Sequence, residues 1–186
     1  MIGILGLLAV WSLVAAAAGW LDPGIFGLSA MLLTLVVLVA ASVVANEAIG
    51  RLAGAAPHAD SAIITALLLW FLYWPSTEPA TLGWLALIAV LAQASKYLIA
   101  VRRRHLVNPA AAGVVLAMLL AWATGIGTIP YTTWWAASEI LLPVAVVGAL
   151  LVLYRTGRLD IGLIFVLVAA PHADSAIITA LLLWFL

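Results

Sequence analysis

Apolar residues in this chain come in long runs that glycine, proline and charged residues separate. The runs do not alternate between apolar and polar positions, as half-buried strands do, so we expect no β-strands. Four runs have the length of full helices, at about 2–20, 25–47, 82–101 and 136–154, and two are shorter, at 61–74 and 109–122. The pattern therefore predicts an all-α protein.

The two shorter segments suggest helices that stop part-way through a membrane. A helix of 14 residues is roughly 21 Å long, which is less than the ~30 Å hydrocarbon core of a bilayer. A polar helix end at that depth is tolerated only against protein or a water-filled cavity. We expect two half-length helices within a bundle.

Composition indicates that this bundle is surrounded by lipid. Hydrophobic residues make up 68% of the 186 residues and charged residues 8%, against about 25% charged in soluble domains. The fold class that follows is a polytopic transmembrane helical bundle with the lipid bilayer as its partner. A formal net charge of zero argues against a nucleic-acid partner, and the absence of cysteine excludes a thiolate metal site. No metal site is predicted.

The distribution of charge predicts an orientation. If the N-terminus is cytoplasmic and each segment crosses the membrane, all seven basic residues fall on one side, including the run Arg102–Arg104. The opposite interface then receives a belt of tryptophans: Trp20, Trp74, Trp84, Trp134 and Trp135. We expect an integral protein of a bacterial or archaeal inner membrane, with the N-terminus and Arg102–Arg104 in the cytoplasm.

An identical 18-residue stretch, AAPHADSAIITALLLWFL, occupies residues 55–72 and 169–186. It is interpreted either as the trace of an inverted duplication or as a transplanted copy. Halves of an ancient duplication diverge, whereas these copies are identical. The second copy would also bring Asp174 near mid-membrane, where an acid costs about 2.5–3.5 kcal/mol. We therefore expect a transmembrane domain over 1–168 and a duplication or truncation artefact at 169–186.

The first candidate site opens the segment 61–74. Asp60 or Ser61 can cap this helix by accepting hydrogen bonds from its free N–H groups. Alternatively, the polar end points into a membrane-buried site, with Ser61 and Thr65 on one helix face because they are four residues apart. His58 is an additional candidate because histidine titrates near neutral pH.

The second candidate group surrounds the end of the helix at 82–101. Lys96 either extends to the interface or faces the bundle and pairs with an acid or an anionic ligand. Arg104 belongs to a run that is typical of a topology anchor, with phosphate contact as the alternative. Asn108 and Pro109 predict a helix start, with Asn108 as N-cap and Pro109 at the first helical position.

These motifs resemble one membrane family. Its motifs appear here as Ser61–Leu69 (SAIITALLL), Lys96-Tyr97 and Asn108–Gly113 (NPAAAG). The family comprises related membrane proteins of the sodium-pumping NADH:quinone reductase (Nqr) and of the Rnf ferredoxin:NAD complex, together with membrane modules fused to flavin reductase domains. The resemblance covers about residues 50–168 and is closest to the fused modules, through Trp134-Trp135, Leu141–Pro143 and Arg155–Phe165.

The resemblance implies half of an inverted-repeat bundle similar in fold to urea transporters. It implies FMN or another flavin, or a quinone, as cofactor, and other redox subunits or a flavin reductase domain as partners. The covalent flavin motif of the family, a threonine in a Ser/Gly-Ala-Thr sequence, is not found. Cofactor-binding residues would be Ser61, Thr65, Lys96, Asn108 and Pro109.

Three functions follow as hypotheses. The first is a membrane electron-transport module, ion-coupled in some members of the family and incomplete in this chain, which would make it an oxidoreductase membrane subunit. The second is a passive channel or carrier for a small polar solute or ion, which needs no cofactor. The third is a non-catalytic scaffold subunit.

Overall fold

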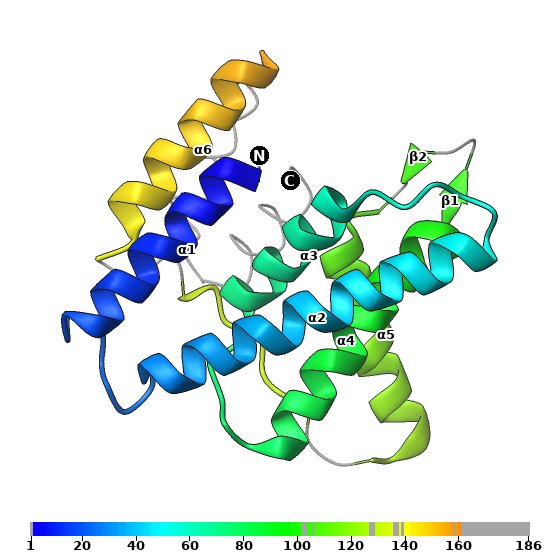
Figure 1. Ribbon diagram of the computed structural model, residues 1–186, viewed down its shortest axis with the longest axis horizontal. Helices are drawn as coiled ribbons and strands as arrows, with labels where there is room; N and C mark the ends of the chain where they lie inside the picture. Colours follow the sequence, from blue (N-terminus) through cyan, green and yellow to red (C-terminus); the bar gives the residue numbers. More distant parts are fainter. Residues whose placement is uncertain are drawn as a thin grey trace.

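Six helices and one short hairpin make up the computed structural model (Figure 1), which describes residues 2–101, 104–105, 107–126, 129–135, 138, 140–157 and 159–160. The helices are α1 (Ile2–Ala17), α2 (Leu28–Leu52), α3 (Ala59–Leu72), α4 (Pro79–Leu98), α5 (Pro109–Thr124) and α6 (Leu142–Thr156). Two helices, α2 and α4, are long and apolar enough to cross a membrane. The expected all-helical class is confirmed, and the second copy of the repeat lies outside the described residues.

The expectation of no strands was wrong at one turn. Residues 100–101 (β1) pair antiparallel with residues 104–105 (β2), immediately after α4 ends at Leu98. The apolar run alone extended this helix to residue 101. The apolar run therefore continues for three residues beyond the end of α4. The hairpin then connects α4 to α5.

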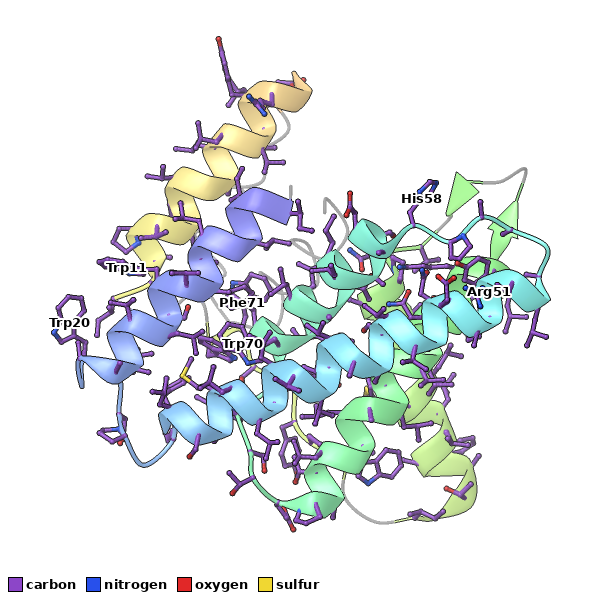
Figure 2. The ribbon with its side chains drawn as sticks, in the orientation of Figure 1. Trp11, Trp20, Arg51, His58, Trp70 and Phe71 are labelled. Atoms are coloured by element: carbon purple, nitrogen blue, oxygen red, sulfur yellow. The ribbon has the colours of Figure 1, made fainter. Side chains whose placement is uncertain are left out.

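The half-length helix α3 forms the centre of the fold. It contacts α1, α2, α4 and α5, and every residue from Leu67 to Tyr73 is buried. A helix that is apolar on all sides needs a core or a membrane around it, and here the other helices cover the second half of α3. Figure 2 shows Trp70 and Phe71 between α1 and α2, in the interior of the molecule.

A tryptophan from the segment before α6 holds the end of α3. The Trp135 indole Nε1 donates to the carbonyl oxygens of Trp70 and Tyr73, at 2.8 and 2.9 Å. Its ring packs edge-on against Trp70, with centroids 4.9 Å apart. Trp135 is only 4% exposed, so its indole packs inside the protein. Trp20 and Trp74, also assigned to the interfacial belt, are exposed; the belt itself stays a prediction.

Helices α1, α5 and α6 present apolar side chains outward. α1 and α6 lie side by side at one edge of the molecule (Figure 1). The exposed residues include Leu7, Val10, Val115, Met118, Leu119, Trp122, Val146, Val147, Leu150 and Leu151. Apolar surface of this extent is typical of contact with lipid or with another protein chain.

Candidate membrane-buried polar site

Polar side chains gather where α2, α3 and α4 meet. We call this set the polar junction: Ser42, Asn46, Ser61, Thr65, Gln93, Lys96 and Tyr97. Ser61 and Tyr97 are half-buried, and the other five are buried. Desolvating this many polar groups inside an apolar bundle is unfavourable unless they find partners, so their hydrogen bonds define what the site can do.

Lys96 points into the bundle from the last turn of α4. Its Nζ donates to the Ser61 carbonyl oxygen at 3.0 Å and to the Ser61 hydroxyl at 3.1 Å, and the residue is 4% exposed. Lys96 therefore faces the bundle, and its partners are the two Ser61 oxygens and not the acid or anionic ligand of the prediction. Within the described part of the chain, the one ion pair joins Arg51 to Glu47, so Lys96 has no carboxylate partner there.

The first turn of α3 supplies the acceptors for Lys96. Ser61 and Thr65 do share a face, because the Thr65 hydroxyl donates to the Ser61 carbonyl oxygen at 2.9 Å. The capping prediction was wrong: His58 is the N-cap residue and makes no side-chain cap bond, and Asp60 lies inside the first turn. The His58 and Asp60 side chains are exposed, whereas Lys96 is buried, so these two candidates lie outside the polar junction.

A second pair of contacts ties α2 to α4 near Lys96. The Tyr97 hydroxyl lies 3.0 Å from the Asn46 Oδ1 and donates to it, and the Asn46 Nδ2 donates to the His58 carbonyl oxygen at 3.4 Å. Gly50 permits this contact, since a Cβ at that position would lie 2.7 Å from the Tyr97 hydroxyl oxygen. Asn46 thus connects α2, the start of α3 and the end of α4.

Gln93 and Ser42 belong to the same junction but lack hydrogen-bond partners. Both side chains have zero exposure. The Gln93 Oε1 and Nε2 and the Ser42 Oγ are buried without a partner in the structure. Each such group costs about 1–3 kcal/mol relative to one that is satisfied. Gln93 is the one side chain among the described residues with two such atoms.

Asn108 and Pro109 start α5 as expected, but in a structural role. The Asn108 Oδ1 accepts from the backbone N–H of Ala110 at 2.9 Å and of Ala111 at 3.4 Å, and Pro109 is the first helical residue. The Asn108 side chain is thus engaged by its own helix and not by the polar junction. Arg104 lies in β2, and its side chain is outside the described atoms.

Small residues bring α5 against α4. A Cβ on Gly113 would lie 2.7 Å from both the Ala92 Cβ and the Ile88 carbonyl oxygen. The absence of a side chain at Gly113 thus allows α5 to lie close to α4. The N-termini of α3 and α5 both lie toward the end of α4 (Figure 1), which places the positive ends of two helix dipoles on the side of Lys96.

The junction is chemically a donor site. Lys96 carries three N–H donors, two of which are directed at Ser61 atoms, and the first turn of α3 offers backbone N–H groups without a side-chain cap. Among the described residues, no group of three or more His, Cys, Asp or Glu side chains could hold a metal ion. The site therefore favours an electron-rich or hydrogen-bond-accepting group.

Sequence reasoning missed Ser42, Asn46 and Gln93. Each is a single polar residue inside a run that is otherwise apolar. Polar residues within a transmembrane segment usually face the bundle and mark functional positions, and that signal was available for Asn46 and Gln93.

Comparison with known proteins adds no relative. A scan against protein-family models finds no match, and neither do searches of curated proteins and of solved structures.

Proposed function

We propose that this chain is an integral membrane module of electron transport, in which the polar junction holds a quinone or the polar part of a flavin. The single observation that carries the proposal is the Lys96 ammonium, buried in an apolar bundle and hydrogen-bonded to Ser61. A buried cation without an opposite charge is strongly unfavourable. An electron-rich ligand would offset that cost.

The residues present fit such a group at one edge of the junction. Ser61 is half-buried, so a ligand oxygen can approach the Lys96 Nζ beside it and accept the remaining N–H. The bound quinone or flavin would supply reversible uptake of electrons. Lys96 would orient its oxygen and stabilise the negative charge that accompanies reduction, and Ser61 would hold the lysine in place.

The motif resemblance supports the same proposal independently of the geometry. It rests on Ser61–Leu69, Lys96-Tyr97 and Asn108–Gly113, and on no relative found by comparison. Within this proposal the chain is the first half of an inverted-repeat bundle similar to urea transporters, and its partners are other redox subunits or a flavin reductase domain.

The membrane placement is part of the proposal. It is supported by the length and apolarity of α2 and α4 and by the outward apolar faces of α1, α5 and α6. Figure 2 draws Trp20 and Arg51 at opposite ends of the molecule, as an outer aromatic interface and a cytoplasmic basic interface require. The N-terminus and Arg102–Arg104 would be cytoplasmic, in a bacterial or archaeal inner membrane.

Ligand binding to purified protein tests the redox proposal. The protein is reconstituted in lipid nanodiscs and titrated with a short-chain quinone, with FMN and with riboflavin, and tryptophan fluorescence reports binding. We expect Lys96→Met to weaken binding about 10- to 100-fold, the range for losing a hydrogen bond to a charged group. Arg51→Met removes an exposed cation and serves as the matched control. Wild-type protein that binds none of the three probes would contradict the proposal.

A passive channel or carrier is the second candidate, and Gln93 is the observation that favours it. Its buried amide has no partner, and it lies about one helical turn before Lys96 on α4, further from the half-buried Ser61 edge. Flux of small solutes into liposomes without any flavin or quinone would support this alternative. Protein that neither binds the probes nor conducts solutes would instead fit a scaffold subunit.

A further inference from the structure

Gln93 is chemically incomplete in a way that no other described residue is. Its amide has an acceptor, Oε1, and a donor group, Nε2, and neither has a partner although the side chain has zero exposure. A buried amide normally satisfies both ends. Gln93 is also the only glutamine among the 186 residues, which makes it directly observable.

Ser42 faces the same region from α2. The two helices run in the same direction, because Thr34 contacts Ser76 just before α4 begins and Asn46 contacts Tyr97 where α4 ends. Ser42 lies four residues before Asn46, and Gln93 lies four residues before Tyr97. Both positions are therefore one helical turn before the Asn46–Tyr97 contact. Because the helices run in the same direction, Ser42 and Gln93 lie at the same height along α2 and α4.

The surroundings restrict what could bind there. Leu38, Ile88 and Ala89 on the same two helices have zero exposure, so the two unpartnered side chains are enclosed by apolar ones, and a ligand that reached them would have to be small. Lys96 lies three residues from Gln93 on α4, close enough to disfavour a cation. The Gln93 amide needs one group that donates and one that accepts, and the Ser42 hydroxyl can do either.

We propose that Ser42 and Gln93 form a binding site for a small uncharged solute that carries both a hydrogen-bond donor and a carbonyl-type acceptor, of which formamide is the simplest probe. The site stands without the redox proposal, since it uses neither the Lys96 Nζ nor Ser61. It names a solute class for the alternative of a passive carrier.

Selective labelling of the single glutamine tests the site. The full chain, with ¹⁵N in its glutamine side chain, is placed in nanodiscs, and the Gln93 amide signals are followed by NMR during titration with formamide. Acetonitrile is the matched control, because it has the same number of heavy atoms but only accepts hydrogen bonds. We expect formamide to shift the signals to saturation and acetonitrile to leave them unchanged.

Variants add a second readout. Ser42→Ala should weaken formamide binding about two- to tenfold, as expected for one neutral hydrogen bond. Ser12→Ala removes a buried hydroxyl from α1, where it bonds the Leu8 carbonyl oxygen, and should change nothing. A linear response, an equal response to acetonitrile, or an amide that contacts only water would overturn the proposal. The probe comparison uses wild-type protein, so it remains decisive if a variant fails to fold.

Discussion

The Lys96 ammonium on α4 bonds both oxygens of Ser61 on α3, across 35 positions of sequence. This contact joins the last turn of one candidate membrane helix to the first turn of a helix too short to cross. Lys96 and Ser61, which were predicted as separate site residues, therefore bond to each other. Lys96 and Ser61 are therefore best tested as a pair.

Replacing Ser61 and replacing Lys96 should change the free energy of unfolding in opposite directions. Ser61→Ala removes an acceptor from a buried cation and should cost about 1.5–3 kcal/mol. Lys96→Met removes the buried charge and keeps its volume, so it should be neutral or stabilising by up to about 4 kcal/mol. Unfolding in sodium dodecyl sulfate, followed by tryptophan fluorescence, measures both. Once Lys96 is replaced by Met, the Ser61→Ala change should no longer be costly. A Ser61→Ala/Lys96→Met double variant as unstable as Ser61→Ala alone would contradict the role of Ser61 in stabilising the Lys96 charge.

The N-cap of α5 predicts a stability effect at Asn108. Asn108→Ala leaves the Ala110 and Ala111 N–H groups without an acceptor and should cost about 0.5–2 kcal/mol. Asn108→Ser keeps a capping oxygen and should remain close to the wild type. The same unfolding assay compares them. If the two variants lose ligand binding while unfolding like the wild type, Asn108 belongs to the binding site instead.

The contact between α4 and α5 predicts the effect of a single methyl group. Gly113→Ala would bring a Cβ to 2.7 Å from the Ala92 Cβ and from a backbone oxygen of α4. Separating the helices should cost about 1–3 kcal/mol. Gly83→Ala is the matched control, because nothing lies within 4 Å of its added Cβ. Equal unfolding curves for the two variants would show that the helices are not packed at Gly113.

The indole of Trp135 allows a test of the hydrogen bonds at the end of α3. Trp135→Phe keeps an aromatic ring but removes the donor to the Trp70 and Tyr73 carbonyl oxygens. We expect a loss of about 1–2 kcal/mol in unfolding free energy. Trp134→Phe, at a ring that also lies near Phe71, should cost less. The reverse order would contradict the bonding described for Trp135.

The hydrophobic pattern predicted which segments form helices, because each helix lies in an apolar run. Its boundaries were less accurate: the helix predicted at 136–154 begins at Leu142, and the helix predicted at 25–47 continues to Leu52. Asn108 and Pro109 mark the start of α5 by capping chemistry that is local to the sequence. The end of α4 could not be placed, since Ile99 to Val101 are as apolar as the helix before them and only the hairpin pairing stops the helix.

The site was predictable only in part. Ser61 and Thr65 share a helix face, which spacing alone reveals. The Lys96–Ser61 and Tyr97–Asn46 contacts depend on how α2, α3 and α4 cross, and no local pattern contains that information. Trp135 shows the same limit, since its sequence position fits an interfacial belt and only the packing of the segment before α6 places it in the interior.

The central position of α3 has a consequence for biogenesis. During synthesis, α3 emerges before Lys96 and before Trp135, the residues that bond its first turn and its last carbonyl groups. It is also too short to span a bilayer alone. A ribosome-bound chain would therefore hold α3 without its partners until residue 135 has left the exit tunnel. For the integral membrane module proposed above, we expect the insertion machinery to shelter this segment, so that α1 to α5 enter the membrane together and not one at a time.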